Sequence, residues 1–165
     1  MHVCIISDLF LGHEGISGGE YSAYILARAL AKRGNGVSVL TSSGKGLKDC
    51  ENLDGINIHR IFNDKLGRNC PKHPLIWPLL YNELNYWDIA IKTVRFANKN
   101  DIDIIHAVNM SEPGAIIAGK ILKKPVVATI NTYQITCPTG VYTIVEDENI
   151  KKCSGCSFKG LYACI

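Results

Sequence analysis

The stretch VCIISDLFLGHEGISGGEYSAYILARALAKRGNGVSVL, residues 3–40, decides the fold of this chain. An apolar run at 3–6 is followed by the turn GISGGE at 15–20, then by helical periodicity, and then by a second apolar run at 37–40. A strand, a glycine turn, a helix and a second strand form the usual opening of a parallel α/β sheet. Glycines at the start of a helix let backbone N–H groups bind an anion, typically a phosphate. The turn therefore predicts phosphate binding.

The helix between the two apolar runs has a single apolar face. Its members recur at helical spacing and are Ala23, Leu26, Ala27, Leu30 and Ala31. Glu20 in the first turn and Lys32 in the last turn suit the helix dipole. Gly34 is placed to end the helix, and the second strand follows it directly.

Alternating helix and strand patterns continue along the chain. In order, the sequence predicts a loop at 42–54, a strand at 56–61, a helix at roughly 79–99, a strand at 103–108, a helix capped by Ser111 with Glu112 and Pro113 in its first turn, and a strand at 126–130. The last strand is continuously apolar, as is typical of a parallel strand covered on both faces. We therefore expect a Rossmann-like three-layer α/β domain with a mostly parallel sheet at 1–136, followed by a cysteine-rich tail at 137–165.

The composition excludes several classes of protein. The 165 residues are 47% hydrophobic and 20% charged, which is ordinary for a globular domain. The net charge of +3 is too small to indicate nucleic-acid binding. No apolar run approaches the ~20 residues that cross a bilayer. Because an apolar strand begins almost at Met1, without a basic segment or a cleavage site, we expect a cytoplasmic protein.

The candidate site lies where the strands end, because ligands of open α/β sheets bind beyond the carboxyl ends of the strands. The loops at 8–19, 107–111 and 131–138 occupy these positions. The glycine turn matches neither the G-x-G-x-x-G fingerprint nor the P-loop. Thr41 and Ser42 stand where a ribose-binding carboxylate would end the second strand, which disfavours NAD. The alternative is that the glycines only start a helix.

Polar residues end three of the predicted strands. Asp8, His106 and Asn131 each follow or close an apolar run on the ligand side of the sheet. Together they predict a polar site for a hydroxyl-rich substrate. The alternative is local hydrogen bonding to the backbone, which Asp and Asn often make.

Several segments together resemble the N-terminal, acceptor-side domain of the retaining GT-B glycosyltransferases of the family-4 type. They are ISDLF at 6–10, SGGE at 17–20, LARALAKRG at 26–34, VSVLTS at 37–42, GINIHRI at 55–61, DIIHA at 103–107 and KPVVATI at 124–130. The resemblance runs from residue 2 to about 138 and implies one half of a GT-B fold. It also implies a full enzyme that transfers a sugar from a nucleotide-sugar donor to a glycan or lipid-linked acceptor, in polysaccharide or glycolipid biosynthesis.

The resemblance also assigns residues. Gly18 matches a glycine whose backbone approaches the donor diphosphate, and His106 matches the first His of the family's H-x-H strand end. The donor-phosphate and substrate-binding candidates are Ser17, Gly18, Gly19, Glu20, Thr132 and Tyr133, and the catalytic candidates are His106 and Asn131. The family needs no catalytic metal. Because its C-terminal domain supplies most nucleotide-sugar contacts, we expect the isolated domain to be inactive.

Three positions depart from the family pattern. Ser17 stands in place of a glycine, Val108 in place of the second His, and Asn131 in place of the His near the reacting sugar. An Asn side chain can hydrogen-bond a sugar hydroxyl, but it cannot transfer a proton at neutral pH. The resemblance therefore supports the geometry of a sugar site more than the details of catalysis.

Four cysteines gather in the last thirty residues. Cys137, Cys153, Cys156 and Cys164 include one tight C-x-x-C pair. Four thiolates are a ligand set for structural zinc, and free thiols and a disulfide are the alternatives. Such a metal site would also fit a different function, that of a non-catalytic Rossmann-like module that binds a partner.

A basic and aromatic stretch precedes and enters the predicted helix at 79–99. Lys65, Arg68 and Lys72 could meet anionic lipid headgroups while the apolar residues after them enter the bilayer boundary, namely Trp77, Leu79 and Leu80. The alternative is an ordinary helix with a solvated basic loop. A peripheral contact with the inner face of a membrane is thus one prediction of the sequence.

Overall fold

The computed structural model describes residues 1–63, 77–131, 143–146 and 149–152. Its elements are β1 (His2–Ser7), α1 (Gly18–Lys32), β2 (Gly36–Ser42), β3 (Cys50–Leu53), β4 (Ile56–Phe62), α2 (Trp77–Ala97), β5 (Ile104–Val108), α3 (Glu112–Leu122), β6 (Val126–Thr129), β7 (Thr143–Glu146) and β8 (Asn149–Lys152). The chain divides into two compact units, Met1–Thr129 and Ile130–Ile165. The predicted boundary between residues 136 and 137 lies within the second unit and stays a prediction.

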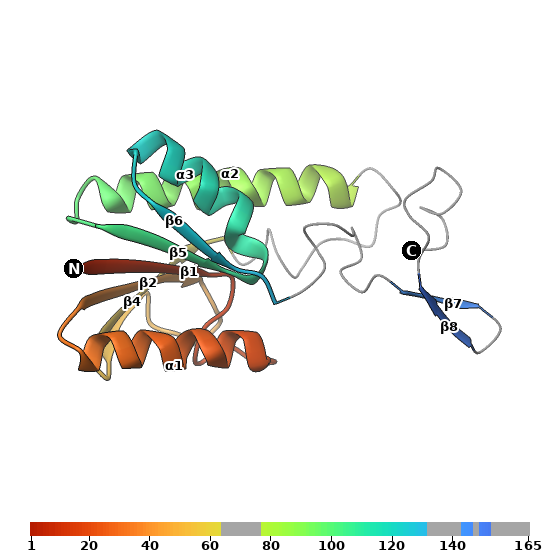
Figure 1. Ribbon diagram of the computed structural model, residues 1–165, viewed down its shortest axis with the longest axis horizontal. Coiled ribbons are helices and arrows are strands. Elements are labelled where there is room, and N and C mark those ends of the chain that lie inside the picture. The colour runs from red at the N-terminus through yellow and green to blue at the C-terminus, as the bar shows by residue number, and fades with distance from the viewer. Residues whose placement is uncertain (64–76, 132–142, 147–148, 153–165) are drawn as a thin grey trace. The chain divides into compact units, whose positions relative to one another are not determined.

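The first unit is a three-layer α/β domain, as the sequence predicts. Its six-stranded sheet has the order β3-β4-β2-β1-β5-β6. All neighbouring strands are parallel except β3 and β4. Helix α1 covers one face, and α2 and α3 lie side by side on the other (Figure 1).

Alternation along the buried strands supplies both hydrophobic cores. In β1, Val3 and Ile5 face α1, whereas Cys4 and Ile6 pack beneath α2 and α3. Burying a side chain such as Ile5 contributes about 1.5–3 kcal/mol. Because both faces need apolar residues, β1 reads as a continuous apolar run, which is the pattern that identified it.

Helix α1 begins and ends as predicted. Ser17 and Glu20 form its amino-terminal cap, and Gly34 adopts a left-handed φ of +79° just beyond its end. Ala23 and Ala27 are buried against the sheet, and the other members of the predicted apolar face are half-buried.

The expectation of a loop at 42–54 is wrong for its last part. Residues Cys50–Leu53 form β3, which pairs antiparallel with β4. Asp54 and Gly55 make the turn with φ of +53° and +79°. Two consecutive left-handed residues are the geometry that a tight hairpin needs, and Asp-Gly is a favoured pair for it.

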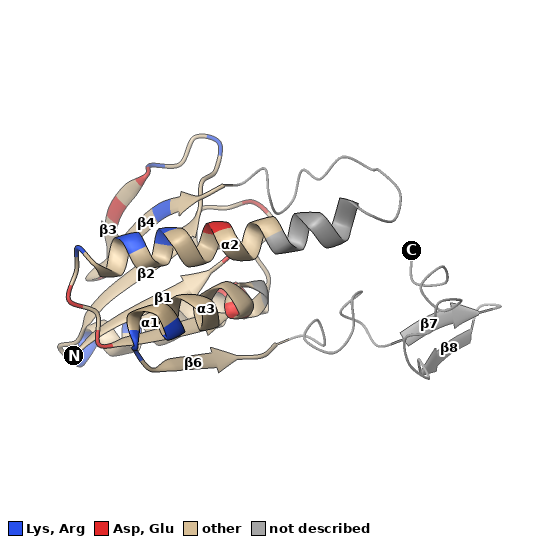
Figure 2. Ribbon diagram, turned by 90° about the horizontal axis from the view of Figure 1, so that it is seen from above, with Lys and Arg blue, Asp and Glu red and all other residues tan. Residues whose placement is uncertain are grey.

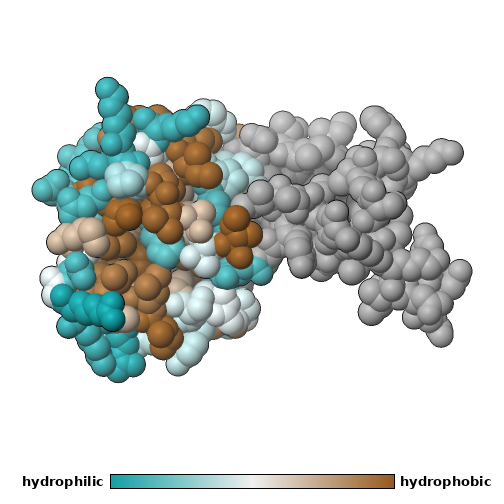
Figure 3. All heavy atoms as spheres, in the orientation of Figure 1, coloured by the Kyte–Doolittle hydropathy of each residue, from teal (hydrophilic) through white to brown (hydrophobic). Residues whose placement is uncertain are grey.

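The expectation that the last strand is covered on both faces is also wrong. β6 is the edge of the sheet, and Val127 in it is 45% exposed. Figure 3 shows apolar side chains over the face that carries α3 and β6, where Ile116 and Ile121 are exposed as well. A run of apolar residues cannot by itself distinguish a central strand from an edge strand.

The cap predicted for α3 takes a different form. Pro113 does lie in the first turn, but a short 3₁₀ helix (Asn109–Ser111) precedes α3. The Ser111 hydroxyl oxygen lies 2.8 Å from the carbonyl oxygens of Ile6 and of Val108, either of which can accept its proton, and it does not cap the helix. Ser111 therefore ties β1 and β5 together at the point where α3 begins.

The described part of the second unit contains a β-hairpin, in which β7 pairs antiparallel with β8. Across the described residues of both units, no helix has the length and apolar character that crossing a bilayer requires.

Candidate functional site

The candidate site lies at the edge of the sheet where the parallel strands end. The register sets the ends of β1, β2, β5 and β6 at this edge, since Ile6 is opposite Leu40, Ser7 is opposite Val108, and Val108 is opposite Thr129. Helix α1 begins at the same edge (Figure 1). Ligands of open parallel sheets bind at this position.

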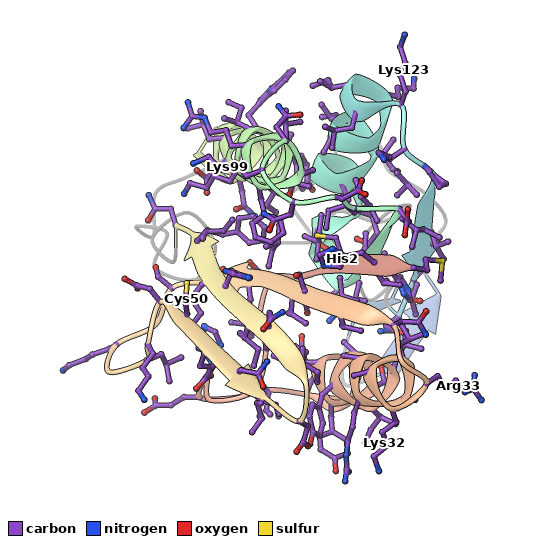
Figure 4. All side chains as sticks on the ribbon, turned by 90° about the vertical axis from the view of Figure 1, so that its left-hand side faces the viewer. His2, Lys32, Arg33, Cys50, Lys99 and Lys123 are labelled. Atoms are coloured by element: carbon purple, nitrogen blue, oxygen red, sulfur yellow. The ribbon has the colours of Figure 1, made fainter. Side chains whose placement is uncertain are left out.

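The helix dipoles favour an anion at this edge. Helices α1 and α3 are the next α-helices after β1 and β5, so their positive amino-terminal ends point toward this edge. The cations Lys32, Arg33, Lys99 and Lys123 lie at the opposite edge, at or just beyond the carboxyl-terminal ends of the helices (Figure 4). These cations complement the negative ends of the dipoles. An anionic group would therefore be stabilised on the side of the glycine turn.

Glu20 connects the glycine turn to Asn109, the residue that follows β5. One carboxylate oxygen accepts the Ser17 N–H at 2.7 Å and also accepts the Ser17 hydroxyl. The other accepts Nδ2 of Asn109 at 2.8 Å. Glu20 was a substrate-binding candidate from the sequence, and the structure shows that both of its oxygens hold the turn in place.

Gly18 lies at the first position of α1 and has open space beside it. A Cβ atom added to Gly18 would have no described heavy atom within 4 Å. Gly18 is also not among the described glycines with a left-handed φ. Neither backbone conformation nor packing within the described residues therefore requires glycine here. The open space leaves room for a ligand to approach the backbone at this position.

Asn109 follows the end of β5 and has a left-handed backbone, with φ of +61°. Such a conformation costs of order 1 kcal/mol for a residue with a side chain, although Asn tolerates it better than most. The hydrogen bond to Glu20 offsets part of this cost. Sequence reasoning missed Asn109, whose only local signal was an Asn directly after a buried strand.

The loop that follows β1 is attached to the end of β2. The Asp8 carbonyl accepts the Ser42 N–H and the Thr41 hydroxyl, both at 3.2 Å. The ring of His13 lies between two carbonyls, with Nδ1 2.9 Å from the oxygen of Phe10 and Nε2 2.9 Å from that of Ser42. The predicted site residue Asp8 thus has a structural part in shaping this loop.

A buried guanidinium holds the same loop from β4. The Arg60 side chain is 2% exposed, and it donates from Nη2 to the Leu11 carbonyl at 2.9 Å and from Nη1 to the Lys48 carbonyl at 2.9 Å. Nη2 also lies 2.6 Å from Glu51 of β3. Sequence reasoning missed this role. The available signal was the spacing of Ile56, Ile58 and Arg60, which places Arg60 on the same buried face of the strand as the two isoleucines.

His106 is half-buried on β5, beside the edge strand. Its Nε2 lies 2.8 Å from the Thr129 hydroxyl. Burial lowers the pKa of His106 below its usual value, which keeps the imidazole neutral at pH 7. A neutral imidazole can accept a hydrogen bond from a hydroxyl group. Asn131 belongs to the second unit and is exposed there.

Glu112 is a buried carboxyl group at the start of α3 that the sequence did not single out as a site. Burial raises its pKa to about 7, while hydrogen bonds from its own N–H and from that of Ser111 act in the opposite direction. The group therefore changes charge near neutral pH, close to the end of β5.

Comparison with known proteins agrees with this geometry. The family model described as Glycosyltransferase Family 4 matches residues 16–143, most of the chain. The chain belongs to glycosyltransferase family 4. No curated protein matches the sequence.

Solved structures show the same fold. A sucrose-phosphate synthase from Thermosynechococcus elongatus is 18% identical, with a TM-score of 0.55 over 82% of this chain and 35% of that protein. A glycosyltransferase from a Streptomyces species is 16% identical, with a TM-score of 0.51 over 80% of this chain and 40% of that protein. The Streptomyces enzyme has also been solved with thymidine diphosphate. This family 4 chain thus spans well under half the length of these relatives.

The remaining site candidates cannot be compared with the structure. Thr132, Tyr133 and the four tail cysteines lie outside the described residues, as do Lys65, Arg68 and Lys72. Among the side chains that are described, no three His, Cys, Asp or Glu groups are placed to hold a metal ion. The structural zinc site in the tail of this family 4 chain stays a prediction.

Proposed function

We propose that this chain is the acceptor-side half of a glycosyltransferase. The full enzyme would transfer a sugar from a nucleotide-sugar donor to a glycan or lipid-linked acceptor, with retention of configuration, and would need no metal for the transfer. Membership of glycosyltransferase family 4 and the polar edge of the sheet support this proposal.

The observation that carries the proposal is the open space at Gly18. A glycine that is free of backbone strain and of packing contacts, at the positive end of α1, leaves room for the donor diphosphate to approach backbone N–H groups. Glu20, held by Ser17 and Asn109, keeps this turn in one conformation before a ligand arrives. A turn that is already ordered loses less entropy on binding.

On the acceptor side, His106 would contact a sugar hydroxyl. Its neutral ring can accept a hydrogen bond from the hydroxyl while Thr129 engages Nε2. From the sequence, Asn131, Thr132 and Tyr133 of the second unit are also candidates for contacts with sugar hydroxyls. Because Asn131 cannot take up a proton at neutral pH, we assign it to binding rather than to proton transfer.

The chain alone should bind sugars without turning over a donor, since it spans 35% and 40% of the two glycosyltransferase-fold relatives. Saturation-transfer NMR with octyl β-D-glucoside and UDP-glucose tests this. With the unmodified chain, we expect saturation to reach the sugar protons of the glucoside. This saturation should be lost in His106→Ala. No new glycoside should form from UDP-glucose in either sample.

His59→Ala is the matched control, because His59 is also half-buried but lies in β4 and packs on Phe96. The proposal is wrong if the glucoside shows no saturation, or if both variants lose it equally. Turnover of UDP-glucose by the chain alone would overturn the half-site assignment. Bound zinc together with no sugar binding would favour the alternative, a non-catalytic module.

A further inference from the structure

The β3–β4 hairpin places a thiol beside an imidazole, outside the residues of the candidate site. Cys50 and His59 are directly opposite each other in the antiparallel register, and Sγ of Cys50 lies 3.5 Å from Nδ1 of His59. Opposite side chains of an antiparallel pair are held within contact distance by the backbone. A nucleophilic side chain within reach of a base is the general arrangement of an activated nucleophile. The pair is therefore equipped for thiol chemistry.

The surroundings of His59 suit the role of a base. Its ring is half-buried and packs on the Phe96 ring of α2, with 4.7 Å between the ring centroids. Burial and the nearby His2 lower the pKa of His59, so the ring is neutral at pH 7 and one of its nitrogens can accept a proton. The carboxylate of Glu51 belongs to the other face of β3, where it pairs with Arg60 at 2.6 Å. Figure 2 shows these two charges on the neighbouring strands β3 and β4.

Access separates Cys50 from Cys4, the other free cysteine that the structure describes. Cys4 is fully buried in β1, and burial raises its pKa to about 12, which keeps it protonated. Cys50 is exposed at the start of the edge strand β3 (Figure 4). A reagent in solution can therefore reach Cys50, but not Cys4, while the chain is folded.

The two residues before Cys50 hold the buried Arg60. The Lys48 carbonyl accepts Nη1 of Arg60 at 2.9 Å, and the Asp49 carbonyl accepts the Arg60 N–H at 2.7 Å. Arg60 in turn donates from Nη2 to the Leu11 carbonyl at 2.9 Å, in the loop that leads to the glycine turn. The start of β3 is thus connected through one guanidinium to the loop after β1.

We propose that Cys50 is a thiol modification site, at which His59 takes the thiol proton and a small organic disulfide transfers half of itself to the sulfur. The sulfur of Cys50 attacks one sulfur of the small molecule, and the old S–S bond breaks as the new one forms. The other half leaves as a thiolate and takes up the proton that His59 holds. Cys50 is oxidised and the departing half is reduced, so no further oxidant is needed.

The modification should loosen the strand that carries it. β3 pairs only with β4 within the described sheet, over its four residues. A charged group on Cys50 ends the contact with His59 and weakens this short pairing, and with it the hold of Arg60 on the loop after β1. The proposal goes beyond the proposed function, since neither Cys50 nor His59 belongs to the candidate site and the exchange needs no sugar.

Incubation of the intact chain with oxidised glutathione, followed by mass spectrometry of its peptides, tests the proposal. We expect glutathione on Cys50 and none on Cys4 while the chain stays folded. His59→Phe, which keeps an aromatic ring in place, and His59→Gln both remove the base, and each should slow the modification of Cys50 at least about fivefold. The matched control is Asn57→Ala, which removes the neighbouring cross-strand hydrogen bond from Asn52 at 2.8 Å and should leave the rate unchanged.

Amide hydrogen exchange measures the effect on the loop after β1. Residues 9–13 should exchange at least about threefold faster once Cys50 carries glutathione. Cys50→Ser, treated in the same way, should show no change, because reaction at any other cysteine remains possible in that variant. Circular dichroism shows whether each variant is folded.

The proposal fails if Cys50 stays unmodified, if Cys4 reacts as fast as Cys50, or if both His59 variants react as fast as Asn57→Ala. It also fails if exchange at residues 9–13 stays the same after Cys50 is modified. No sample contains a sugar or a nucleotide, so these outcomes leave the glycosyltransferase proposal to its own test.

Discussion

The two sides of the candidate site are held in place by different means. The loop after β1 is held by buried polar side chains, above all Arg60 and His13. Helix α3, which begins beside the end of β5, is held by close packing against α2 and β6, in which glycine is required. A Cβ on Gly114 would lie 2.7 Å from the Tyr86 carbonyl oxygen, and one on Gly119 would overlap Val126.

Gly18 differs from the glycines of α3 in this respect. Packing within the chain explains Gly114 and Gly119, whereas nothing within 4 Å among the described residues explains Gly18. The loop side thus combines a firmly held backbone with open space in front of a helix amino terminus. That combination is expected of a surface prepared for a ligand. The following predictions test whether the two sides differ in this way.

The largest loss in the free energy of unfolding is expected for Arg60→Met. The change removes charged donors from two backbone carbonyls, and each such hydrogen bond contributes about 1.5–3 kcal/mol. We expect the free energy of unfolding to fall by about 3 kcal/mol, measured by urea titration. Arg28→Met is the control, since the Arg28–Asp54 pair is 3.4 Å apart and 42% exposed on both sides, which predicts a loss below about 1 kcal/mol. Equal losses would show that Arg60 does not hold the loop.

Gly114→Ala, in α3, should lower the stability of the chain nearly as much as Arg60→Met does. The new methyl group would meet the Tyr86 carbonyl and the Ile89 side chain, and overpacking of this kind costs about 1–3 kcal/mol. The unfolding midpoint in urea should fall accordingly. An unchanged midpoint would mean that α2 and α3 can separate freely, and the proposed contrast between the two sides would be lost.

Glu112→Gln should change how stability depends on pH. In the folded protein the pKa of Glu112 is about 7, above its ordinary value of 4.5. Its protonated form is therefore favoured by folding, and the stability it contributes below pH 4.5 is lost as the pH rises through 7. The Gln variant should equal the unmodified chain in melting temperature near pH 4 and exceed it near pH 8. A constant difference across this range would contradict the raised pKa.

Asn109→Gly should have the smallest effect on stability. Glycine relieves the cost of the left-handed backbone but loses the hydrogen bond to Glu20, so the two changes largely cancel to within about 1 kcal/mol. Amide hydrogen exchange at Ser17–Glu20 should nevertheless increase. Unchanged exchange there would show that Asn109 does not support the glycine turn.

The sequence could predict the regular helices and strands of the fold, but not the contacts between segments that are distant in the chain. The apolar patterns identified β1, α1 and β2, because both faces of the two strands and one face of the helix must be buried. The hairpin at Asp54 and Gly55 was missed in a polar stretch. Arg60 could not be understood locally, since its partner Leu11 lies 49 residues away. The buried state of Glu112 likewise depends on how α3 packs on its neighbours.

The candidate site was predictable in outline only. Gly18, His106 and the strand ends could be located because parallel strands end at one edge of a sheet. The sequence could not show that Glu20 serves the turn itself, or that Asn109 has a left-handed backbone. The Ser17–Glu20 contact is local, but the link from Glu20 to Asn109 joins residues 89 positions apart.

The most direct test of the central claim is Gly18→Ala, read out by melting temperature and by ³¹P NMR line widths of UDP and thymidine diphosphate. Alanine fits the open space and favours the helix, so the melting temperature should stay equal or rise. The added methyl group should block the diphosphate, and the broadening that the unmodified chain causes should fall at least about fivefold. Gly34→Ala, at a left-handed φ of +79°, should instead lower the melting temperature and leave the broadening unchanged. If Gly18→Ala broadens the phosphate signals as the unmodified chain does, the turn does not face the donor.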